Sequence, residues 1–476
     1  MSRRLHFRPP DGYVGDIHPF FHDGVYYLFY LKPPLEPERS GIKGMVSALV
    51  TSRNLIDWEE VPIKHLPSSG AGAAVSAEAL SEPWWAISII QHRQSQRFFA
   101  FYPRGSGIFA STSDNLLTWH PFPVNPVLPP KLDTYREWRD PFVFWNEEER
   151  SYWMLLTTSL QGKPEFEGGA ISYACSNDLQ YWDFKGTLYH PGNIGSPECP
   201  EMFRMDKKWY LIASFLTPKG VGKTSYRVAD SLHGRWNTMV PDSLDGIDLC
   251  AGNTVYDGKR RLLFGWIPTY GGSEESRGQQ WGGDLALPRE VYVLPNGSLG
   301  TRLPNEIGNL GRSRRPIPPS KWLVKQGTWD RGARTLHNLS APALLVAPSL
   351  MKTAYVEVSL RACDKTAAGG VVLCNSAGES LFGVYIDWQQ SQLKIVRTLP
   401  SGTVTLNSLV LGTLAASDLA LRALVEEDIL EVFLGNRYSL ATRLTRCVAP
   451  FVLGVQVERG SIHFQNCSVC ELAKPS

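Results

Sequence analysis

The chain has 476 residues with 48 basic and 46 acidic side chains, so its net charge is +2. This length is too great for one ordinary domain, and the nearly neutral charge excludes a dedicated surface for nucleic acid or an anionic membrane. Hydrophobic residues make up 43% of the chain, which excludes disorder, and 15 Trp, 18 Tyr and 20 Phe beside 42 Gly and 34 Pro favour an all-β protein with an aromatic-lined pocket.

The N-terminal segment is basic, but no apolar stretch of the kind found in secretory signals follows it. No apolar run reaches the ~18 residues that a membrane-spanning helix needs. The sequence as given therefore predicts a cytoplasmic protein without a membrane partner. A secreted protein is the alternative if a leader before Met1 has been removed.

A repeated turn divides the first 300 residues. Each copy runs from a serine through a leucine to a tryptophan, at residues 52–58, 113–119 and 176–182, and a looser copy spans 229–236. An aromatic hairpin precedes each turn, and a degenerate hairpin lies around 97–102. Five units of ~50–70 residues, each able to form a four-stranded sheet, predict a five-bladed β-propeller that closes near 281–291.

The chain changes character after the propeller. We expect the propeller to occupy 1–303, a basic, proline-rich linker to occupy 304–320, and a second domain to occupy 321–476. Short alternating strands such as 354–360 and 429–434 predict that this C-terminal domain is a β-sandwich. A homodimer that pairs through this domain is compatible with the sequence.

Three carboxylates occupy similar places in the repeat. Asp16, Asp140 and Glu198 lie 11 or 12 residues before an aromatic residue of their hairpin, where the first strand of a blade begins. First strands line the central channel of a propeller, so these acids should converge and push their pKa values apart. One protonated acid among ionised neighbours is the arrangement that glycoside cleavage uses. The alternative is that each acid only caps a turn before a proline.

Two motifs give the chain a family resemblance. The segments Arg139-Asp140-Pro141 and Glu198-Cys199, together with 281–290 and 421–433, resemble glycoside hydrolase family 32, the invertase, inulinase and levanase group. The resemblance implies a retaining mechanism on the β-fructofuranosyl units of a fructose-containing oligosaccharide or fructan, without a cofactor or metal. By position, Asp16 is then the nucleophile and Glu198 the general acid and base. Asp140, with Arg139 beside it, then binds sugar hydroxyls and stabilises the transition state.

The sequence departs from the family around the nucleophile. The common family motif is Asn-Asp-Pro-Asn-Gly, whereas this chain has Gly-Asp-Ile-His-Pro at 15–19 and so lacks two amides that bind the terminal fructosyl unit. His18 either replaces one of these contacts or packs as an ordinary strand residue. The further substrate-binding candidates are Ser76 in a weak match to the family's Phe-Ser-Gly segment, the aromatic platforms Trp85 and Trp281, and the acid Asp248 at the start of the fifth unit.

Other readings of the site stay open at this point. A fructosyltransferase would use the same covalent intermediate, a family 43-like arabinofuranosidase would usually invert, and a non-catalytic propeller would only bind sugar. The pair Cys467 and Cys470 lacks the second pair or the histidines that a tetrahedral zinc site needs, so ordinary strand cysteines are expected.

Overall fold

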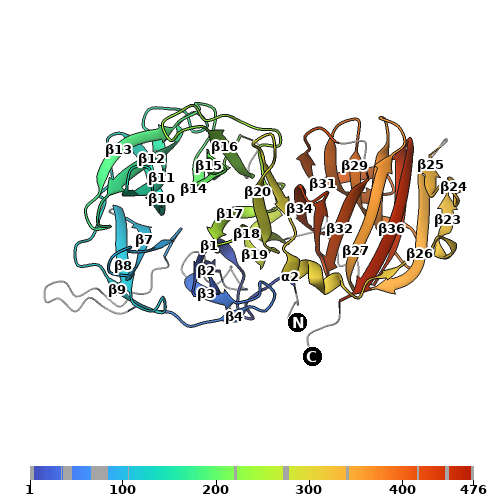
Figure 1. The fold of residues 1–476 in the computed structure, drawn as a ribbon, viewed down its shortest axis with the longest axis horizontal. Coiled ribbons are helices and arrows are strands. Elements are labelled where there is room, and N and C mark those ends of the chain that lie inside the picture. Colours follow the sequence, from blue (N-terminus) through green and yellow to red (C-terminus); the bar gives the residue numbers. More distant parts are fainter. Residues whose placement is uncertain are drawn as a thin grey trace.

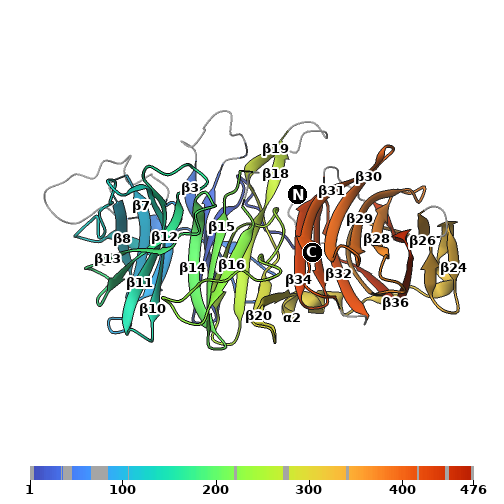
Figure 2. The same ribbon diagram turned by 90° about the horizontal axis from the view of Figure 1, so that it is seen from above.

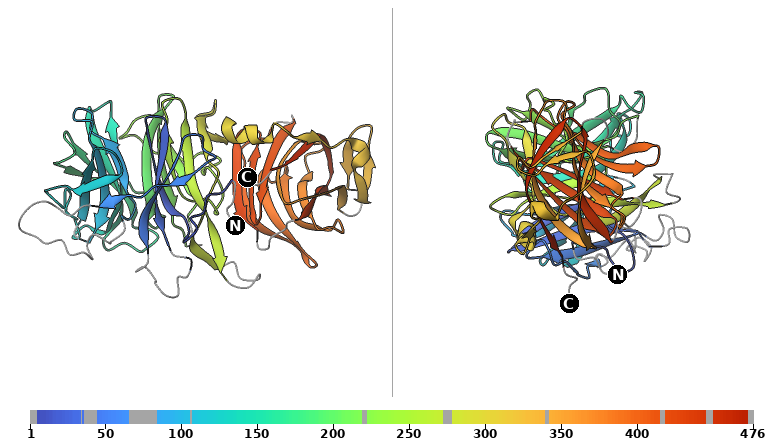
Figure 3. Two further views of the ribbon diagram at one scale, coloured as in Figure 1. Left: turned by 90° about the horizontal axis from the view of Figure 1, so that it is seen from below. Right: turned by 90° about the vertical axis from the view of Figure 1, so that its right-hand side faces the viewer.

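The computed structural model describes residues 5–33, 35, 45–65, 84–105, 107–218, 222–271, 278–338, 342–414, 418–444 and 450–472. Nearly all of the regular structure is β-strand, arranged in two bodies that lie end to end along the longest axis (Figures 1, 2 and 3). Within the described residues, no helix combines the length and the apolar composition that crossing a membrane requires.

Five sheets, antiparallel except for the parallel pair of β5 and β9, surround a common axis in the first body, which confirms the predicted five-bladed propeller (Figure 1). The strands of the first three blades are, in sheet order, β1 (Gly15–His22), β2 (Val25–Lys32), β3 (Val46–Ser52) and β4 (Glu59–Glu60); β6 (Ser88–Gln91), β7 (Phe98–Arg104), β8 (Gly107–Ser113), β9 (Thr118–Pro121) and β5 (Lys64–His65); and β10 (Tyr135–Asn146), β11 (Ser151–Leu160), β12 (Gly169–Ser176) and β13 (Asp183–Tyr189).

The last two blades differ from the regular four-stranded form. Blade four has three strands, and two isolated bridges to β16, at Asn237 and Ser243, stand where a fourth strand is expected. Blade five carries an additional strand, β19, that pairs with β18. The strands of these blades are β14 (Pro197–Met205), β15 (Lys208–Phe215) and β16 (Thr224–Ala229), then β17 (Cys250–Tyr256), β18 (Arg261–Gly271), β19 (Gly278–Leu285), β20 (Arg289–Val293) and β21 (Leu299–Arg302).

The repeated turn joins the third and fourth strands of blades one to three. Its serine hydroxyl accepts the amide N–H of the leucine at Leu55 and Leu179, both at 2.9 Å. Leu55, Leu116 and Leu179 all have positive φ, between 64° and 66°, and are buried. The hydroxyl bond and burial hold these β-turn leucines in a conformation that is otherwise unfavourable. The tryptophan that follows packs between blades, as Trp119 does against Phe29 of blade one.

The second body is a sandwich of two antiparallel sheets, as predicted, around one large apolar core. One sheet consists of β22 (Arg315–Pro316), β24 (Thr328–Asp330), β25 (Thr335–His337), β36 (Ser461–Glu471), β27 (Thr353–Ala362), β32 (Leu419–Glu426), β33 (Ile429–Leu434) and β34 (Tyr438–Arg443). The other consists of β23 (Leu323–Gln326), β26 (Ala343–Met351), β35 (Phe451–Arg459), β28 (Ala368–Cys374), β29 (Ser380–Asp387), β30 (Gln392–Leu399) and β31 (Gly402–Val410).

The segment between the two bodies is partly ordered against the sandwich. It contains the short helix α2 (Asn305–Gly308), the 3-10 turns η3 (Asn309–Gly311) and η4 (Pro319–Lys321), and β22, which pairs with β36. Part of the segment predicted as a basic, proline-rich linker, 304–320, therefore joins the sandwich sheet.

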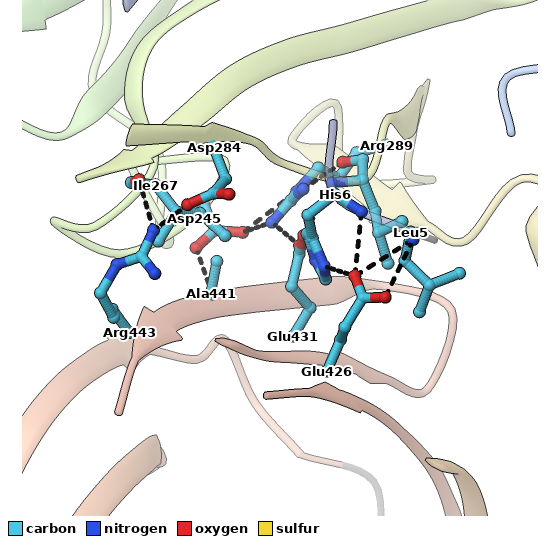
Figure 4. A network of polar contacts seen from close by, with 11 residues as sticks. Leu5, His6, Asp245, Ile267, Asp284, Arg289, Glu426, Glu431, Ala441 and Arg443 are labelled. Carbon is cyan, nitrogen blue, oxygen red and sulfur yellow. Dashed lines mark hydrogen bonds and ion pairs between the residues drawn. The ribbon is translucent and has the colours of Figure 1, made fainter. Parts of the chain in front are cut away.

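A buried network of charges joins the two bodies (Figure 4). The His6 ring lies between two sandwich carboxylates, 2.8 Å from Glu426 and 3.0 Å from Glu431. Arg289 of blade five pairs with Glu431 and, at 3.1 Å, with Asp245. Because a buried charge is tolerated only when it is paired, this network favours one relative placement of propeller and sandwich.

Candidate active site

The first strand of four blades is interrupted by a β-bulge at an equivalent point. The pairing with the second strand shifts between residues 15 and 18, 139 and 142, 198 and 201, and 250 and 253. One residue of each bulge has positive φ, namely Asp16, Asp140, Cys199 and Ala251. Bulges of this kind redirect side chains at the rim of a sheet. In this propeller they turn Asp16 and Asp140 toward the central cavity.

Glu198 occupies a different position in its bulge from the other two acids. It pairs with Ser214 as Arg139 pairs with Thr157, so it stands one residue before the position of Asp16 and Asp140. The three acids have similar spacings in the sequence, but Glu198 does not occupy the same position in its bulge as Asp16 and Asp140. This position allows Glu198 to form an ion pair with Arg139 of the neighbouring blade.

The three acids and Arg139 line one cavity of about 810 Å³ at the centre of the propeller. Its wall contains all three predicted catalytic acids and three of the predicted substrate-binding residues. The lining includes Asp16, Trp85, Trp138, Arg139, Asp140, Glu198, Cys199, Ser214, Trp266, Pro268 and Trp281.

Arg139 connects two of the acids. Its guanidinium donates to Asp140 at 2.6 Å and to Glu198 at 3.0 Å. Asp140 also accepts the Thr157 hydroxyl at 2.9 Å and the Cys199 amide N–H at 3.1 Å, and it is only 6% exposed. Three donors hold this carboxylate in one orientation, which suits a group that binds and stabilises rather than one that moves.

Two of the acids hold protons more strongly than ordinary carboxyl groups. Burial, followed by the negative charges of Asp140 and Glu198, raises the pKa of Asp16 from 3.8 to about 7, against the opposing effects of the Trp266 indole and Arg139. Burial also raises the pKa of Glu198, although Arg139 lowers it in part. The sequence predicted one carboxyl group with a raised pKa among ionised neighbours. Burial instead raises the pKa of both Asp16 and Glu198, and the negative charge of Glu198 contributes to the shift at Asp16.

The effect of the Asp140 charge on Asp16 makes a prediction for the pH dependence of the site. The charge of Asp140 raises the pKa of Asp16, so Asp140→Asn should lower it. We expect the limb of the kcat/KM profile near pH 7 in the unaltered chain to move to lower pH in the variant, whatever the loss in absolute rate. Rate measurements between pH 4 and 9 test this, and a limb that stays in place or moves to higher pH contradicts this effect of Asp140.

Of the remaining predicted substrate-binding residues, some line the cavity and others do not. Trp85 and Trp281 lie on the cavity wall, and Trp281 is 41% exposed. His18 is not among the lining residues; its Nε2 is buried with no hydrogen-bond partner among the described residues, and burial lowers its pKa to about 4 despite the charge of Asp140. Ser76 lies outside the described residues.

Asp248 is the candidate that the structure contradicts. It is fully buried and accepts a hydrogen bond from the Thr442 hydroxyl of the sandwich at 2.5 Å. It precedes the bulge of blade five and faces the neighbouring domain, so it is not part of the cavity wall. Its place at the start of the fifth unit suggested that it lines the cavity. It lies two residues before Cys250, the first residue of this strand that does line the cavity.

Three residues of the site were missed in the sequence. Thr157, Ser214 and Trp266 lie on second strands, directly opposite Arg139, Glu198 and Cys250 in the hairpin pairing. Ser214 and Trp266 line the cavity, and Thr157 supports Asp140. Counting back across each predicted hairpin could have found them, because antiparallel pairing places these residues beside the bulge.

Comparison with known proteins agrees with this arrangement. The model of the glycosyl hydrolases family 32 N-terminal domain matches residues 6–301. The chain is 28% identical over 331 residues to an acid beta-fructofuranosidase of Solanum lycopersicum, an alignment that covers 63% of this chain and 50% of that protein. It is 25% identical over 519 residues to an extracellular exo-inulinase of Aspergillus niger, covering 94% and 89% of the two proteins.

A solved structure shares both domains. The exo-inulinase from Aspergillus awamori superposes with a TM-score of 0.72 and 18% identity, covering 99% of this chain and 98% of that one. This likeness shows the propeller and sandwich fold. The chain spans about half of the length of the tomato relative, whereas its match to the Aspergillus niger relative is nearly complete.

Proposed function

The chain belongs to glycosyl hydrolase family 32, and from this premise we propose that it is a retaining glycosidase that cleaves terminal β-fructofuranosyl units from a fructose-containing oligosaccharide or fructan. The observation that carries the proposal is the meeting of Asp16, Asp140 and Glu198 on one cavity, with Arg139 between the last two. A propeller alone would not suffice, because one fold serves many activities.

The two acids with raised pKa values divide the reaction between them. Asp16, when ionised, attacks the anomeric carbon of the fructosyl unit, and the glycosidic C–O bond breaks as Glu198 gives its proton to the leaving oxygen. Water then attacks the same carbon, gives a proton to the Glu198 carboxylate, and releases the sugar from Asp16. The proton and the carboxylate are both restored, so no other reactant is needed.

Asp140 and Arg139 act without forming bonds to the sugar carbon. The ordered Asp140 carboxylate accepts hydrogen bonds from sugar hydroxyls and faces the positive charge that develops on the ring. Arg139 keeps Asp140 in place and, through its 3.0 Å bond to Glu198, orients the proton donor. Ser214, which is buried and lines the cavity with no hydrogen-bond partner for its hydroxyl among the described residues, is a further contact for a sugar hydroxyl.

The stereochemistry of the product tests the mechanism. We expect that cleavage in the presence of methanol yields methyl β-fructofuranoside, because two successive displacements restore the starting configuration. Nuclear magnetic resonance identifies the anomer, which stays fixed because a methyl glycoside, unlike free fructose, does not mutarotate. The α-product would show inversion and support the family 43-like alternative, whereas transfer to a sugar acceptor in preference to water would support the transferase alternative.

The choice of substrate calls for a direct screen. Sucrose, inulin-type and levan-type oligosaccharides and aryl fructofuranosides should be compared by kcat/KM, with products identified. Cleavage of at least one of these fructosides by the unaltered chain is the expected outcome. Failure on all of them, with saturable sugar binding, would instead favour a non-catalytic sugar-binding propeller.

Two further expectations stay proposals. A cytoplasmic location is supported by the seven described cysteines, all of which are free thiols, as a reducing compartment keeps them; imaging of the tagged protein tests it. A homodimer through the sandwich is supported by the edge strand β23, where Leu323 and Val324 are about half exposed. Sedimentation of the chain over a range of concentrations tests the dimer.

A further inference from the structure

Blade five supplies one wall of the cavity. Trp266 and Pro268 come from β18 and Trp281 from β19. A side-chain carbon placed on Gly15 would lie 2.4–2.9 Å from three atoms of the Trp281 indole, so the indole rests on the backbone immediately before Asp16. A movement of Trp281 would therefore change the packing against Gly15, next to the proposed nucleophile Asp16.

The strand that carries Trp281 is irregular. The pairing of β19 with β18 shifts between Pro268 and Thr269, and Gly282 has a φ of 93°. At Gly283, a side-chain carbon would lie 1.8 Å from the Ile267 carbonyl oxygen. A bulge leaves its extra residue outside the regular ladder, so contacts beyond the sheet must determine where Trp281 lies.

An arginine of the sandwich provides these contacts. Arg443, at the end of β34, donates from Nε to the Pro268 carbonyl at 2.6 Å and from Nη2 to the Ile267 carbonyl at 3.3 Å. The same guanidinium pairs with Asp284 of β19, and its Nη1 is held at 2.7 Å by Asp428 of the sandwich. Figure 4 shows Arg443 reaching from the sandwich strand to Asp284 and Ile267. The side chain is about 5% exposed, so these contacts are shielded from water.

We propose that Arg443 is a positioning residue for the active site. By holding both strands of the cavity wall, it keeps Trp281 against Gly15 and thereby the aromatic surface and Asp16 in register for a sugar ring. The sandwich domain is then a working part of the site. The inference rests on the proposed function only for its activity measurement.

The experiment compares Arg443→Gln with Ser439→Ala on the same strand. Ser439 bonds to Asp245 and to the Leu244 carbonyl, away from the cavity wall, so its variant is the control for a general weakening of the interface. We expect kcat/KM to fall about 10–100-fold in Arg443→Gln and to change less than about threefold in Ser439→Ala. Asp284 keeps an ion pair with Arg8 in the variant, which favours correct folding.

A double-mutant cycle separates positioning from simple destabilisation. If Arg443 acts through Trp281, Arg443→Gln should lower kcat/KM less than about threefold in a Trp281→Ala background. Additive losses, or unchanged kcat/KM in folded Arg443→Gln, would overturn the proposal. If Arg443→Gln does not fold, Arg443→Lys keeps a charge opposite Asp284 but loses the forked donation to the two carbonyls, and is read out in the same way.

Fluorescence tests the inference without any substrate. The difference in emission between the chain and its Trp281→Phe variant isolates Trp281, and we expect acrylamide to quench this component more strongly after Arg443→Gln. Unchanged quenching would count against the proposal even if no fructoside is cleaved by any form of the chain. Failure of the proposed function and failure of the positioning role are thus distinguished.

Discussion

Replacing Asp16 by Asn should abolish turnover and, at the same time, stabilise the protein at neutral and alkaline pH. Loss of the nucleophile should lower kcat on a β-fructofuranoside on the order of 10⁴-fold or more. The gain in stability arises because the folded protein holds the Asp16 carboxylate where burial and two negative charges oppose its ionisation.

The pH range of this effect follows from the raised pKa. Between 3.8 and about 7 the folded chain binds more protons at Asp16 than the unfolded chain, so this group's contribution to stability falls as pH rises through that window. A shift of this size corresponds to about 4 kcal/mol at most. The free energy of unfolding of Asp16→Asn should therefore exceed that of the parent at pH 8, and the difference should vanish near pH 4.

Thermal unfolding of both proteins at the two pH values provides the measurement. The comparison at low pH is an internal control, because protonated aspartate and asparagine are nearly isosteric and equally uncharged. Substantial turnover by the variant would refute the role of Asp16. A stability gain of equal size at both pH values would refute the electrostatic explanation, while leaving the chemical role untouched.

Replacing Glu198 by Gln should impair substrates according to their leaving groups. Cleavage of a sugar–sugar bond needs a proton on the departing oxygen, so we expect kcat/KM to fall ~10²–10⁴-fold. An aryl fructofuranoside with an acidic phenol leaves without this help, and its first step should be affected much less. Parallel kinetics on the two substrate types measure the difference.

The matched control for this variant is Glu137→Gln. Glu137 lies 3.7 Å from Arg139 and accepts a hydrogen bond from Ser196, but it is not among the residues that line the cavity. Its variant tests whether loss of any nearby negative charge is sufficient, and we expect a much smaller effect on either substrate. Equal losses of kcat/KM on the two substrate types in Glu198→Gln would be inconsistent with a general acid at this position, because kcat/KM reports the first displacement alone.

The repeated turn and the three acids could be predicted from the sequence because both depend on contacts between residues close together in the chain. The repeated turn places its leucines in the left-handed region by hydrogen bonds within four residues, so its spacing in the sequence reports directly on the spacing of the blades. The three acids were found for the same reason, since each precedes its hairpin by a nearly constant number of residues. The fold class and the composition of the acid cluster both follow from such short-range patterns.

The surroundings of each acid and the shape of the cavity wall depend on contacts between segments far apart in the chain. Glu198 lies just before its bulge, where it contacts Arg139 of the neighbouring blade, whereas Asp248 lies two residues before the corresponding position of blade five and contacts Thr442 of the sandwich. The pKa of Asp16 depends on charges that arrive from two other blades, and Trp281 depends on Arg443 from the other domain. The sequence by itself therefore determined the blades and the acids they carry. Only the tertiary structure decided their protonation and the wall around them, because burial and long-range pairing exist only once the blades and the sandwich have packed.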